Sequence, residues 1–214
     1  MEVELLTVTP DAERLIEAAG RTCYDTGGRA AADSAAKFIR MLIRRGHLSV
    51  LEHASATFRV KGVSRALTHQ LVRHRLASYS QRSQRYVKED GLAYVTPPAI
   101  AANTEVLDVF RKALEEARGA YDKLLEAGVA PEDARFVLPN ATATEVVVTA
   151  NFREWRHIIA LRGHAAAQWE IRQLAIAILK ELKKKAPATF ADLEINEAEQ
   201  TITQVEEKGG GNYS

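Results

Sequence analysis

Apolar side chains recur at helical spacing over several long segments, and this recurrence limits the chain to a helix-rich fold. The longest stripe lies in residues 103–127 and consists of Leu107, Phe110, Leu114, Ala117, Tyr121 and Leu124. Two further stripes consist of Phe152, Trp155 and Ile159, and of Ile171, Leu174, Ile178 and Leu182. Because such spacing places apolar groups on one side of a helix, each segment must bury that side against a core.

Segments typical of strands are fewer and shorter. Alternation or β-branched residues predict strands over residues 2–8, 54–61 and 142–150. Capping residues predict further helices over residues 9–19, 34–45 and 64–75, a short helix from Pro131, and helices beginning at Asn151 and at residue 168. Gly20 and Gly46 are expected just beyond two helix ends, with loops over residues 21–33 and 76–86. This pattern favours an α+β fold dominated by helices.

The chain shows no internal repeat and no linker composition. Its 214 residues, of which 46% are hydrophobic and 27% charged, are typical of a globular protein. We therefore expect a single domain over residues 1–205. Residues 206–214 are polar and glycine-rich, and we expect them to form a disordered tail.

Several protein classes are excluded by composition. No apolar run approaches the roughly 20 residues of a membrane helix, and the N-terminus lacks the pattern of a signal peptide. Cys23 is the only cysteine, so the chain has no internal disulfide, and we expect a cytoplasmic protein without membrane contact. The formal net charge of +1 gives no general tendency to bind nucleic acid.

Common catalytic motifs are also missing. The sequence contains no G-x-G-x-x-G after a strand, no phosphate-binding P-loop, no G-x-S-x-G, no C-x-x-C and no H-E-x-x-H. No metal site is therefore predicted. If the protein used a cysteine nucleophile, it would have to be Cys23, but a lone cysteine is more often a packing residue.

One stretch of the chain is free of acidic residues. Residues 53–88 contain no Asp or Glu, while holding Arg59, Lys61, Arg65, Arg73, Arg75, Arg82, Arg85 and Lys88. Within it, a predicted helix ends at Arg73-His74-Arg75 and leads into a segment rich in Ser, Gln and Arg. Such donors suit a phosphate group.

Three other interpretations of this stretch remain open. It could be a solvated basic helix, a surface that docks an acidic partner, or a nucleic-acid-binding module. The aromatic residues that would stack bases are few, namely Phe58, Tyr79 and Tyr86, which weakens the last alternative.

A second segment of interest runs from Asn151 to Glu170. Its candidate functional residues each have a structural explanation. Asn151 and Glu154 have the spacing of a capping box, His157 can lie on a solvated face, and Arg162 can stabilise a helix C-terminus. Taken alone, none of these residues indicates a function.

Together the two segments resemble a known family. Arg73-His74-Arg75, followed eight positions later by Ser83, is similar to the R-H-R-x7-S signature of the flavin-dependent thymidylate synthases. The resemblance covers roughly residues 5–190. It extends to Gly46-His47-x-Ser49, Glu52-His53, Gln70, Ala77-Ser78-Tyr79, Ser83-x-Arg85-Tyr86, Ala134-Arg135-x-Val-Leu-Pro139 and residues 151–170.

This resemblance implies reductive methylation of dUMP to dTMP. The carbon would come from 5,10-methylenetetrahydrofolate and the hydride from FAD reduced by NADPH. It also implies a helix-flanked antiparallel sheet and a homotetramer whose active sites lie between subunits.

The resemblance further assigns roles to residues. Arg162 would be catalytic, stabilising the pyrimidine anion by its fixed charge. The matching dUMP-binding positions are Gln70, Arg73, Gln81, Arg82, Ser83, Gln84, Arg85, Arg135 and Arg162. The matching FAD-binding positions are Ser49, Arg73, His74, Arg75, Gln81, Asn151, Arg153 and His157. His47 and Glu52 are second-tier candidates near the flavin, and Ser83 is expected to bind phosphate because no base is evident beside it.

The chain departs from the family pattern at three positions. Ser80 stands where many members carry Asn, Gln81 where many carry Glu, and His157 where some carry Asn. The carboxylate contact expected at position 81 is therefore lost.

Overall fold

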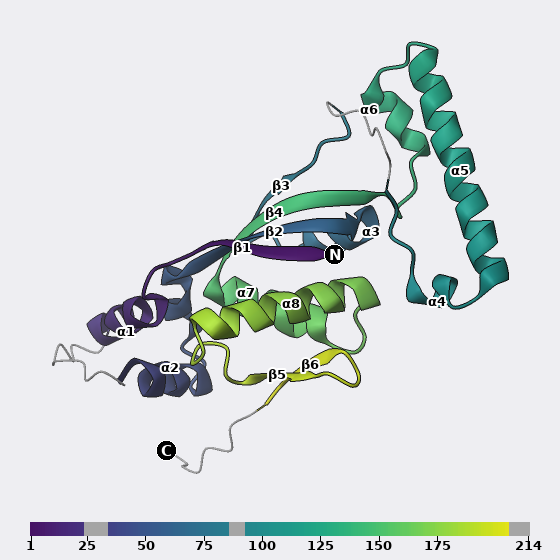
Figure 1. The fold of residues 1–214 in the computed structure, drawn as a ribbon. Coiled ribbons are helices and arrows are strands. Elements are labelled where there is room, and N and C mark those ends of the chain that lie inside the picture. The colour runs from purple at the N-terminus through teal and green to yellow at the C-terminus, as the bar shows by residue number, and fades with distance from the viewer. Residues whose placement is uncertain (24–33, 86–92, 206–214) are drawn as a thin grey trace. The chain divides into compact units, whose positions relative to one another are not determined.

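The chain forms a four-stranded sheet with the strand order β1-β2-β4-β3 (Figure 1). The computed structural model describes residues 1–23, 34–85 and 93–205. The strands are β1 (Glu2–Val8), β2 (Ser55–Ser64), β3 (Ser78–Gln81) and β4 (Ala143–Asn151). Burial alternates along β4, so every second side chain faces the core. The expected α+β fold with an antiparallel sheet is confirmed.

The remaining elements are helices and a hairpin. The α-helices are α1 (Ala12–Cys23), α2 (Ser34–Arg44), α3 (Arg65–Leu71), α4 (Pro98–Ala101), α5 (Thr104–Glu126), α6 (Pro131–Ala134), α7 (Phe152–Gly163) and α8 (Trp169–Lys185). Two short 3-10 helices are η1 (Leu48–His53) and η2 (Arg135–Val137). Strands β5 (Leu193–Asn196) and β6 (Thr201–Gln204) form an antiparallel hairpin.

The chain divides into two compact units, which we name after their central helices. The α5 unit contains Met1–Glu2, Val60–Leu71 and Ser80–Val147. The α7 unit contains Val3–Arg59, Val72–Tyr79 and the chain from Val148 onward. That residues 1–205 form one domain stays a prediction, and the expected tail over residues 206–214 lies outside the described residues.

In the α7 unit, helix α7 packs against strand β2. The buried Trp155 ring meets Phe58 edge to face at 5.3 Å, and its Nε1 donates a hydrogen bond of 3.0 Å to the Ala56 carbonyl oxygen. Helix α8 lies alongside α7, and the β5–β6 hairpin packs against both helices (Figure 1). A large aromatic group with a satisfied N–H therefore fixes α7 to strand β2.

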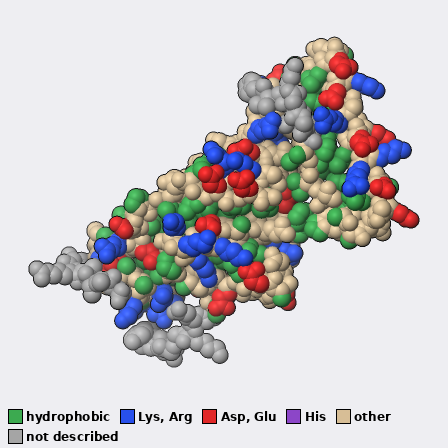
Figure 2. Space-filling view, viewed as in Figure 1, with side chains coloured by type: hydrophobic (Ala, Val, Ile, Leu, Met, Phe, Trp, Pro, Cys, Tyr) green, Lys and Arg blue, Asp and Glu red, His purple; other side chains and the backbone are tan. Residues whose placement is uncertain are grey.

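In the α5 unit, a smaller apolar cluster lies beneath helix α5. Tyr121 and Ala134 are buried, and the partly buried side chains of Tyr94, Leu124, Leu125, Val129 and Leu138 pack against them. Figure 2 shows acidic and basic side chains intermixed over α5. The helix predicted over residues 103–127 is confirmed, with Asn103 as its N-cap.

Two predicted helix ends are wrong. Helix α1 continues through Gly20 to Cys23, because Gly20 is buried in the packing against α2: a Cβ atom there would lie 2.6 Å from Cε1 of Phe38. Helix α3 is capped by Ser64 as expected but ends at Leu71 instead of Arg75. The predicted loop over residues 76–86 contains strand β3, and the sequence patterns did not predict the β5–β6 hairpin.

Candidate active site

His74 lies just beyond α3, in the α7 unit, and only 5% of it is exposed. Its carbonyl oxygen accepts hydrogen bonds from the Tyr79 hydroxyl at 3.0 Å and from the Ala77 N–H at 3.2 Å. These bonds fix the backbone on both sides of the turn. The imidazole ring is thereby held inside the unit.

The ring of His74 has a polar group at each nitrogen. Nε of Arg162, in the last turn of α7, donates a hydrogen bond of 2.9 Å to Nε2 of His74. Oε1 of Glu154 lies 3.5 Å from Nδ1. Because a guanidinium group keeps its protons, Nε2 must be the acceptor. The neutral ring therefore carries its proton on Nδ1, which faces Glu154.

Burial and nearby cations keep His74 uncharged at neutral pH. Burial lowers the pKa of His74 to about 4, and the charges of Arg162 and His157 act in the same direction. The ring of His157 meets that of His74 edge to face at a centroid distance of 5.5 Å. His74 thus accepts from Arg162 throughout the neutral pH range.

The pKa values of the carboxyl group of Glu154 and the phenol group of Tyr79 are raised in this cluster. Burial raises the pKa of Glu154, although His157 opposes the shift. Burial, with Glu154 adding to it, raises the pKa of Tyr79 to about 12, while Arg162 opposes. The Tyr79 hydroxyl therefore keeps its proton, as its bond to the His74 carbonyl requires.

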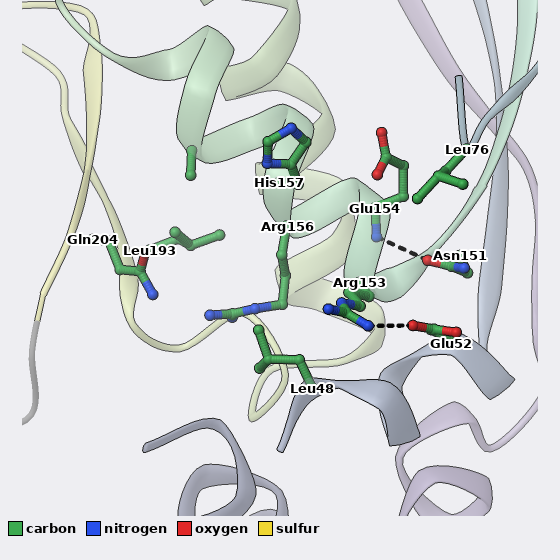
Figure 3. Close-up of a pocket in the computed structure, with 11 residues that line it drawn as sticks. Leu48, Glu52, Leu76, Asn151, Arg153, Glu154, Arg156, His157, Leu193 and Gln204 are labelled. Carbon is green, nitrogen blue, oxygen red and sulfur yellow. Dashed lines mark hydrogen bonds and ion pairs between the residues drawn. The ribbon is translucent and has the colours of Figure 1, made fainter. Parts of the chain in front are cut away.

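A pocket of about 620 Å³ opens beside this cluster. Its lining residues are Leu48, Glu52, Leu76, Asn151, Arg153, Glu154, Arg156, His157, Ala160, Leu193 and Gln204. Figure 3 shows side chains of α7 between η1 and the hairpin, and an ion pair of 2.5 Å joins Arg153 to Glu52. Three of the predicted FAD positions, Asn151, Arg153 and His157, are among the lining residues.

Asn151 also has the structural role that its sequence position suggests. Its Oδ1 accepts a hydrogen bond of 2.8 Å from the Glu154 N–H, which caps α7. Of the other predicted FAD positions in this unit, His74 is buried, while Ser49, Arg73 and Arg75 are exposed. They do not line the pocket.

One pair of residues at the pocket was missed by sequence reasoning. Nη1 and Nη2 of Arg156 each bond a carboxylate oxygen of Asp192 at 2.7 Å, and Nη1 also bonds the Thr189 carbonyl oxygen. Burial alone would raise the pKa of Asp192, but Arg156 and Gln204 hold it below the usual value. This network attaches the hairpin to α7, and the hairpin supplies Leu193 and Gln204 to the pocket wall.

In the α5 unit, two predicted nucleotide-binding arginines meet at Glu132. Nε and Nη2 of Arg85 lie 3.1 and 3.0 Å from Oε2 of Glu132. Nε of Arg135 donates to the Glu132 carbonyl oxygen at 3.0 Å. The sequence places Arg85 and Arg135 far apart, whereas the fold brings both to one residue of α6.

The other predicted nucleotide contacts of this unit are held locally. Gln81 Nε2 donates to Oγ1 of Thr68 at 3.0 Å, and Ser83 Oγ accepts from the Arg85 N–H at 3.1 Å. Gln84 is buried, and its Nε2 has no hydrogen-bond partner among the described residues. Gln70 and Arg82 also belong to this unit.

Within the described ranges, no cluster of His, Cys, Asp or Glu side chains could hold a metal ion. None of the helices there is long and apolar enough to cross a membrane.

Comparison with known proteins identifies the family. The model of the family described as "Thymidylate synthase complementing protein" matches residues 4–188. The flavin-dependent thymidylate synthase of Geobacter sulfurreducens is 46% identical over 200 residues, covering 90% of this chain and 86% of that protein. The chain belongs to the flavin-dependent thymidylate synthases.

Two further similarities agree with this family. The flavin-dependent thymidylate synthase of Mycobacteroides abscessus is 48% identical over 198 residues, covering 85% of this chain and 79% of that protein. A crystal structure of the UMP/dUMP methylase PolB from Streptomyces cacaoi, bound with 5-Br dUMP, superposes with a TM-score of 0.80. It is 28% identical and covers 89% of this chain and 93% of that one.

The pocket suits the FAD that flavin-dependent thymidylate synthases use. FAD joins an anionic pyrophosphate to an apolar ring system that carries polar edges. The pocket offers the guanidinium group of Arg153 and the imidazole of His157, while Leu48, Leu76 and Ala160 supply apolar wall. Its donor set therefore fits a flavin nucleotide.

Proposed function

We propose that this flavin-dependent thymidylate synthase converts dUMP to dTMP with Arg162 as the group that activates the pyrimidine. The carbon comes from 5,10-methylenetetrahydrofolate, and NADPH reduces the FAD. The observation that carries the proposal is the hydrogen bond of 2.9 Å from Nε of Arg162 to the buried, neutral His74. This bond orients a permanently charged guanidinium group next to the flavin-binding motif.

The chemistry requires a fixed cation. C5 of uracil is a poor nucleophile, and it reacts only when the ring carries anionic, enolate-like character. A guanidinium group held against the ring stabilises that charge without giving up a proton. Since Nε of Arg162 is committed to His74, rotation of the guanidinium plane is restricted, and the group is preorganised for the developing anion.

A thiol mechanism has less support. Cys23 is exposed at the end of α1, where its Sγ lies 3.6 Å from the Ala19 carbonyl oxygen of the same helix. A thiol needs an adjacent base or cation to become a strong nucleophile, and the contact of the Cys23 thiol is with a backbone carbonyl oxygen. Arg162 is therefore the better candidate for activating uracil.

We assign the phosphate of dUMP to the α5 unit. Arg85 and Arg135 can present guanidinium forks to a phosphate, and the Ser83 hydroxyl can add a further hydrogen bond. Gln70, Gln81, Arg82 and Gln84 complete the proposed nucleotide contacts in this unit. The assignment of Arg73 to the nucleotide stays a prediction. The Glu132 carboxylate, which now bonds Arg85, must give way when the phosphate binds.

We assign FAD to the pocket of the α7 unit. When bound, FAD supplies the hydride that completes the methyl group. Arg153 is proposed to pair with the pyrophosphate, and His157 and Asn151 to contact the flavin through their polar atoms. Ser49, His74 and Arg75 are proposed as further flavin contacts in this unit, with His47 and Glu52 as second-tier candidates. The assignment of Gln81 to the flavin stays a prediction.

The oligomeric state and compartment are also proposals. We infer a homotetramer in the cytoplasm, with active sites shared between subunits. Large exposed apolar side chains support assembly, since Phe136 is 83%, Leu76 77% and Val109 72% exposed in the single chain.

The activity is tested by product formation. Purified protein with FAD, NADPH, 5,10-methylenetetrahydrofolate and dUMP should form dTMP, which chromatography detects directly. Omission of dUMP, 5,10-methylenetetrahydrofolate or NADPH should abolish the product, and the protein should be yellow from bound FAD. A colourless protein that forms no dTMP under these conditions would contradict the proposal.

A further inference from the structure

We propose that Glu154 is a positioning residue that holds His74, and through His74 the guanidinium group of Arg162, in the orientation that catalysis requires. The proposal rests on the role assigned to Arg162 above. It goes beyond that role because Glu154, which lines the pocket, is given no part in it. The three residues form a chain from the first turn of α7, through the turn after α3, to the last turn of α7.

The first observation is where the Glu154 carboxylate lies. Glu154 is the third residue of α7, where a glutamate ordinarily reaches back to the N–H of the capping residue. Here the first half of the capping box forms, since Asn151 Oδ1 accepts from the Glu154 N–H at 2.8 Å. The carboxylate instead faces His74, with Oε1 at 3.5 Å from Nδ1. The capping role therefore explains the backbone of Glu154 but not its side chain.

The second observation is burial. The side chains of Glu154 and His74 are 7% and 3% exposed. Burying a carboxyl group costs free energy unless a partner compensates it. Among the described residues, the ion pairs and hydrogen bonds of its carboxylate lead to His74 and to no lysine or arginine. A buried group that brings little stability is a candidate for a functional role.

The third observation is the protonation state of the His74 ring. Because Nε2 accepts from Arg162, Nδ1 carries the proton and needs an acceptor inside the unit. A carboxyl oxygen can accept that proton whether Glu154 is ionised or neutral, so the contact persists despite the raised pKa of Glu154. The separation of 3.5 Å is long, as hydrogen bonds between catalytic groups often are before substrate binds.

The contact with Glu154 orients the His74 ring so that Nε2 can accept the hydrogen bond from Arg162. Without Glu154 the buried Nδ1–H would lose its partner, and the ring could turn about χ2 to seek another. Nε2 would then leave Nε of Arg162, and the guanidinium group would lose its fixed plane. Misplacing a catalytic group by about 1 Å can cost on the order of a hundredfold in rate.

Two substitutions test the proposal in the holoenzyme. Glu154→Leu removes the acceptor while keeping the volume, and we expect kcat to fall about ten- to a hundredfold. The KM for dUMP should change less than about threefold, because the phosphate contacts lie elsewhere. Glu154→Gln keeps a carbonyl acceptor and should restore kcat to within about threefold of the wild type.

Stability provides the readout that separates positioning from a structural role. The midpoint of thermal unfolding of Glu154→Leu should stay within a few degrees of the wild type, because removing the buried carboxyl group offsets the cost of the Nδ1–H that loses its partner. Glu17 is the matched control, since it is also buried but bonds Arg21 and Ser34. Glu17→Leu should lower the midpoint while leaving kcat unchanged.

Nitrogen-15 NMR of His74 checks the remaining link. At neutral pH the wild type should show a protonated Nδ1 and an unprotonated Nε2, and the opposite tautomer would overturn the proposal. A wild-type kcat in Glu154→Leu, or a Glu154→Gln variant as slow as Glu154→Leu, would also overturn it. Arg162→Ala runs in parallel: full activity in that variant would instead overturn the catalytic role of Arg162.

Discussion

Nε of Arg162 donates a hydrogen bond of 2.9 Å to Nε2 of His74, across 88 residues of sequence. The bond joins the two sequence segments that first suggested a function, the Arg73-His74-Arg75 motif and the end of the helix that begins after Asn151. Since His74 is buried and neutral, the bond is one between a fixed cation and a strong acceptor. It provides a physical reason for the position of the proposed catalytic arginine.

The first prediction concerns the shape of the cation at position 162. Arg162→Lys keeps the charge but loses Nε and the planar fork, so it cannot bond His74 and face a pyrimidine at the same time. We expect kcat for dTMP formation to fall at least about a hundredfold. Bound FAD, measured by visible absorbance, should stay near the wild-type level.

The control for this substitution is Arg40, which is exposed on α2. Arg40→Lys should have wild-type kinetics. An Arg162→Lys enzyme that retains more than a third of the wild-type kcat would show that charge alone is sufficient.

The second prediction concerns the pH dependence of stability. The pKa of His74 is about 4 in the folded protein, below its ordinary value of 6.5, so the unfolded chain binds the proton more tightly. The stability associated with the neutral ring is complete above pH 6.5 and is lost as the pH falls from 6.5 toward 4. The titratable and charged groups that face His74 are Glu154, His157, Tyr79 and Arg162. The raised pKa of Glu154 has the opposite effect on stability, because its contribution increases as the pH falls.

His74→Gln isolates this contribution, because an amide does not titrate and the other groups are retained. Urea unfolding at several pH values should show a steeper loss of stability for the wild type than for the variant between pH 6.5 and 4. Parallel curves for the two proteins would mean that His74 is not buried in its neutral form.

The third prediction concerns Glu132 as a competitor of the phosphate. Its carboxylate now bonds Arg85, and both side chains are about half exposed, so the pair is worth at most about 1 kcal/mol. Glu132→Gln should therefore lower the KM for dUMP by up to about fivefold and leave kcat unchanged. Steady-state kinetics at constant ionic strength measure this change.

Arg135→Ala gives the opposite result at the same place. Loss of a charged hydrogen bond to phosphate should raise the KM for dUMP about ten- to a hundredfold. Unchanged KM values in both variants would place the phosphate site elsewhere on the chain.

The fourth prediction concerns the ion pair that attaches the hairpin to α7. Asp192→Ala leaves the buried Arg156 without its carboxylate partner, which we expect to cost about 3–5 kcal/mol of unfolding free energy. The double variant Arg156→Met, Asp192→Leu should be more stable than Asp192→Ala, because no uncompensated charge is left. Thermal unfolding measures stability, and fluorescence titration should show weaker FAD binding when the hairpin that carries Leu193 and Gln204 loosens.

The fifth prediction concerns the glycine next to the proposed catalytic arginine. A Cβ atom on Gly163 would lie 2.6 Å from Cβ of Ile202, so the end of α7 or strand β6 must shift. Gly163→Ala should cost about 1–3 kcal/mol of stability and reduce kcat, because the shift displaces Arg162. Gly119→Ala is the control: a Cβ atom there has no neighbour within 4 Å, and that variant should fold and function normally.

Much of the secondary structure follows from local patterns. The apolar stripes predict the helices α5, α7 and α8. In the structure Asn103, Asn151 and Gln168 cap them by accepting a hydrogen bond from the first turn. Errors arose where packing overrides local preference. Gly20 continues a helix because α2 approaches it closely, and residues 78–81 form a strand because β4 offers its edge.

Local sequence by itself determined the helix-rich character of the chain, its acid-free segment and the motif that resembles its family. Tertiary structure alone decided that Arg162 reaches His74, that Arg85 and Arg135 meet at Glu132, and that Arg156 is neutralised by Asp192. Periodicity and capping act over one or two turns of chain, so they can be read from neighbouring residues. Burial and hydrogen bonds between distant segments arise only when the chain has packed, and these set the charge and orientation of the groups proposed to act in catalysis.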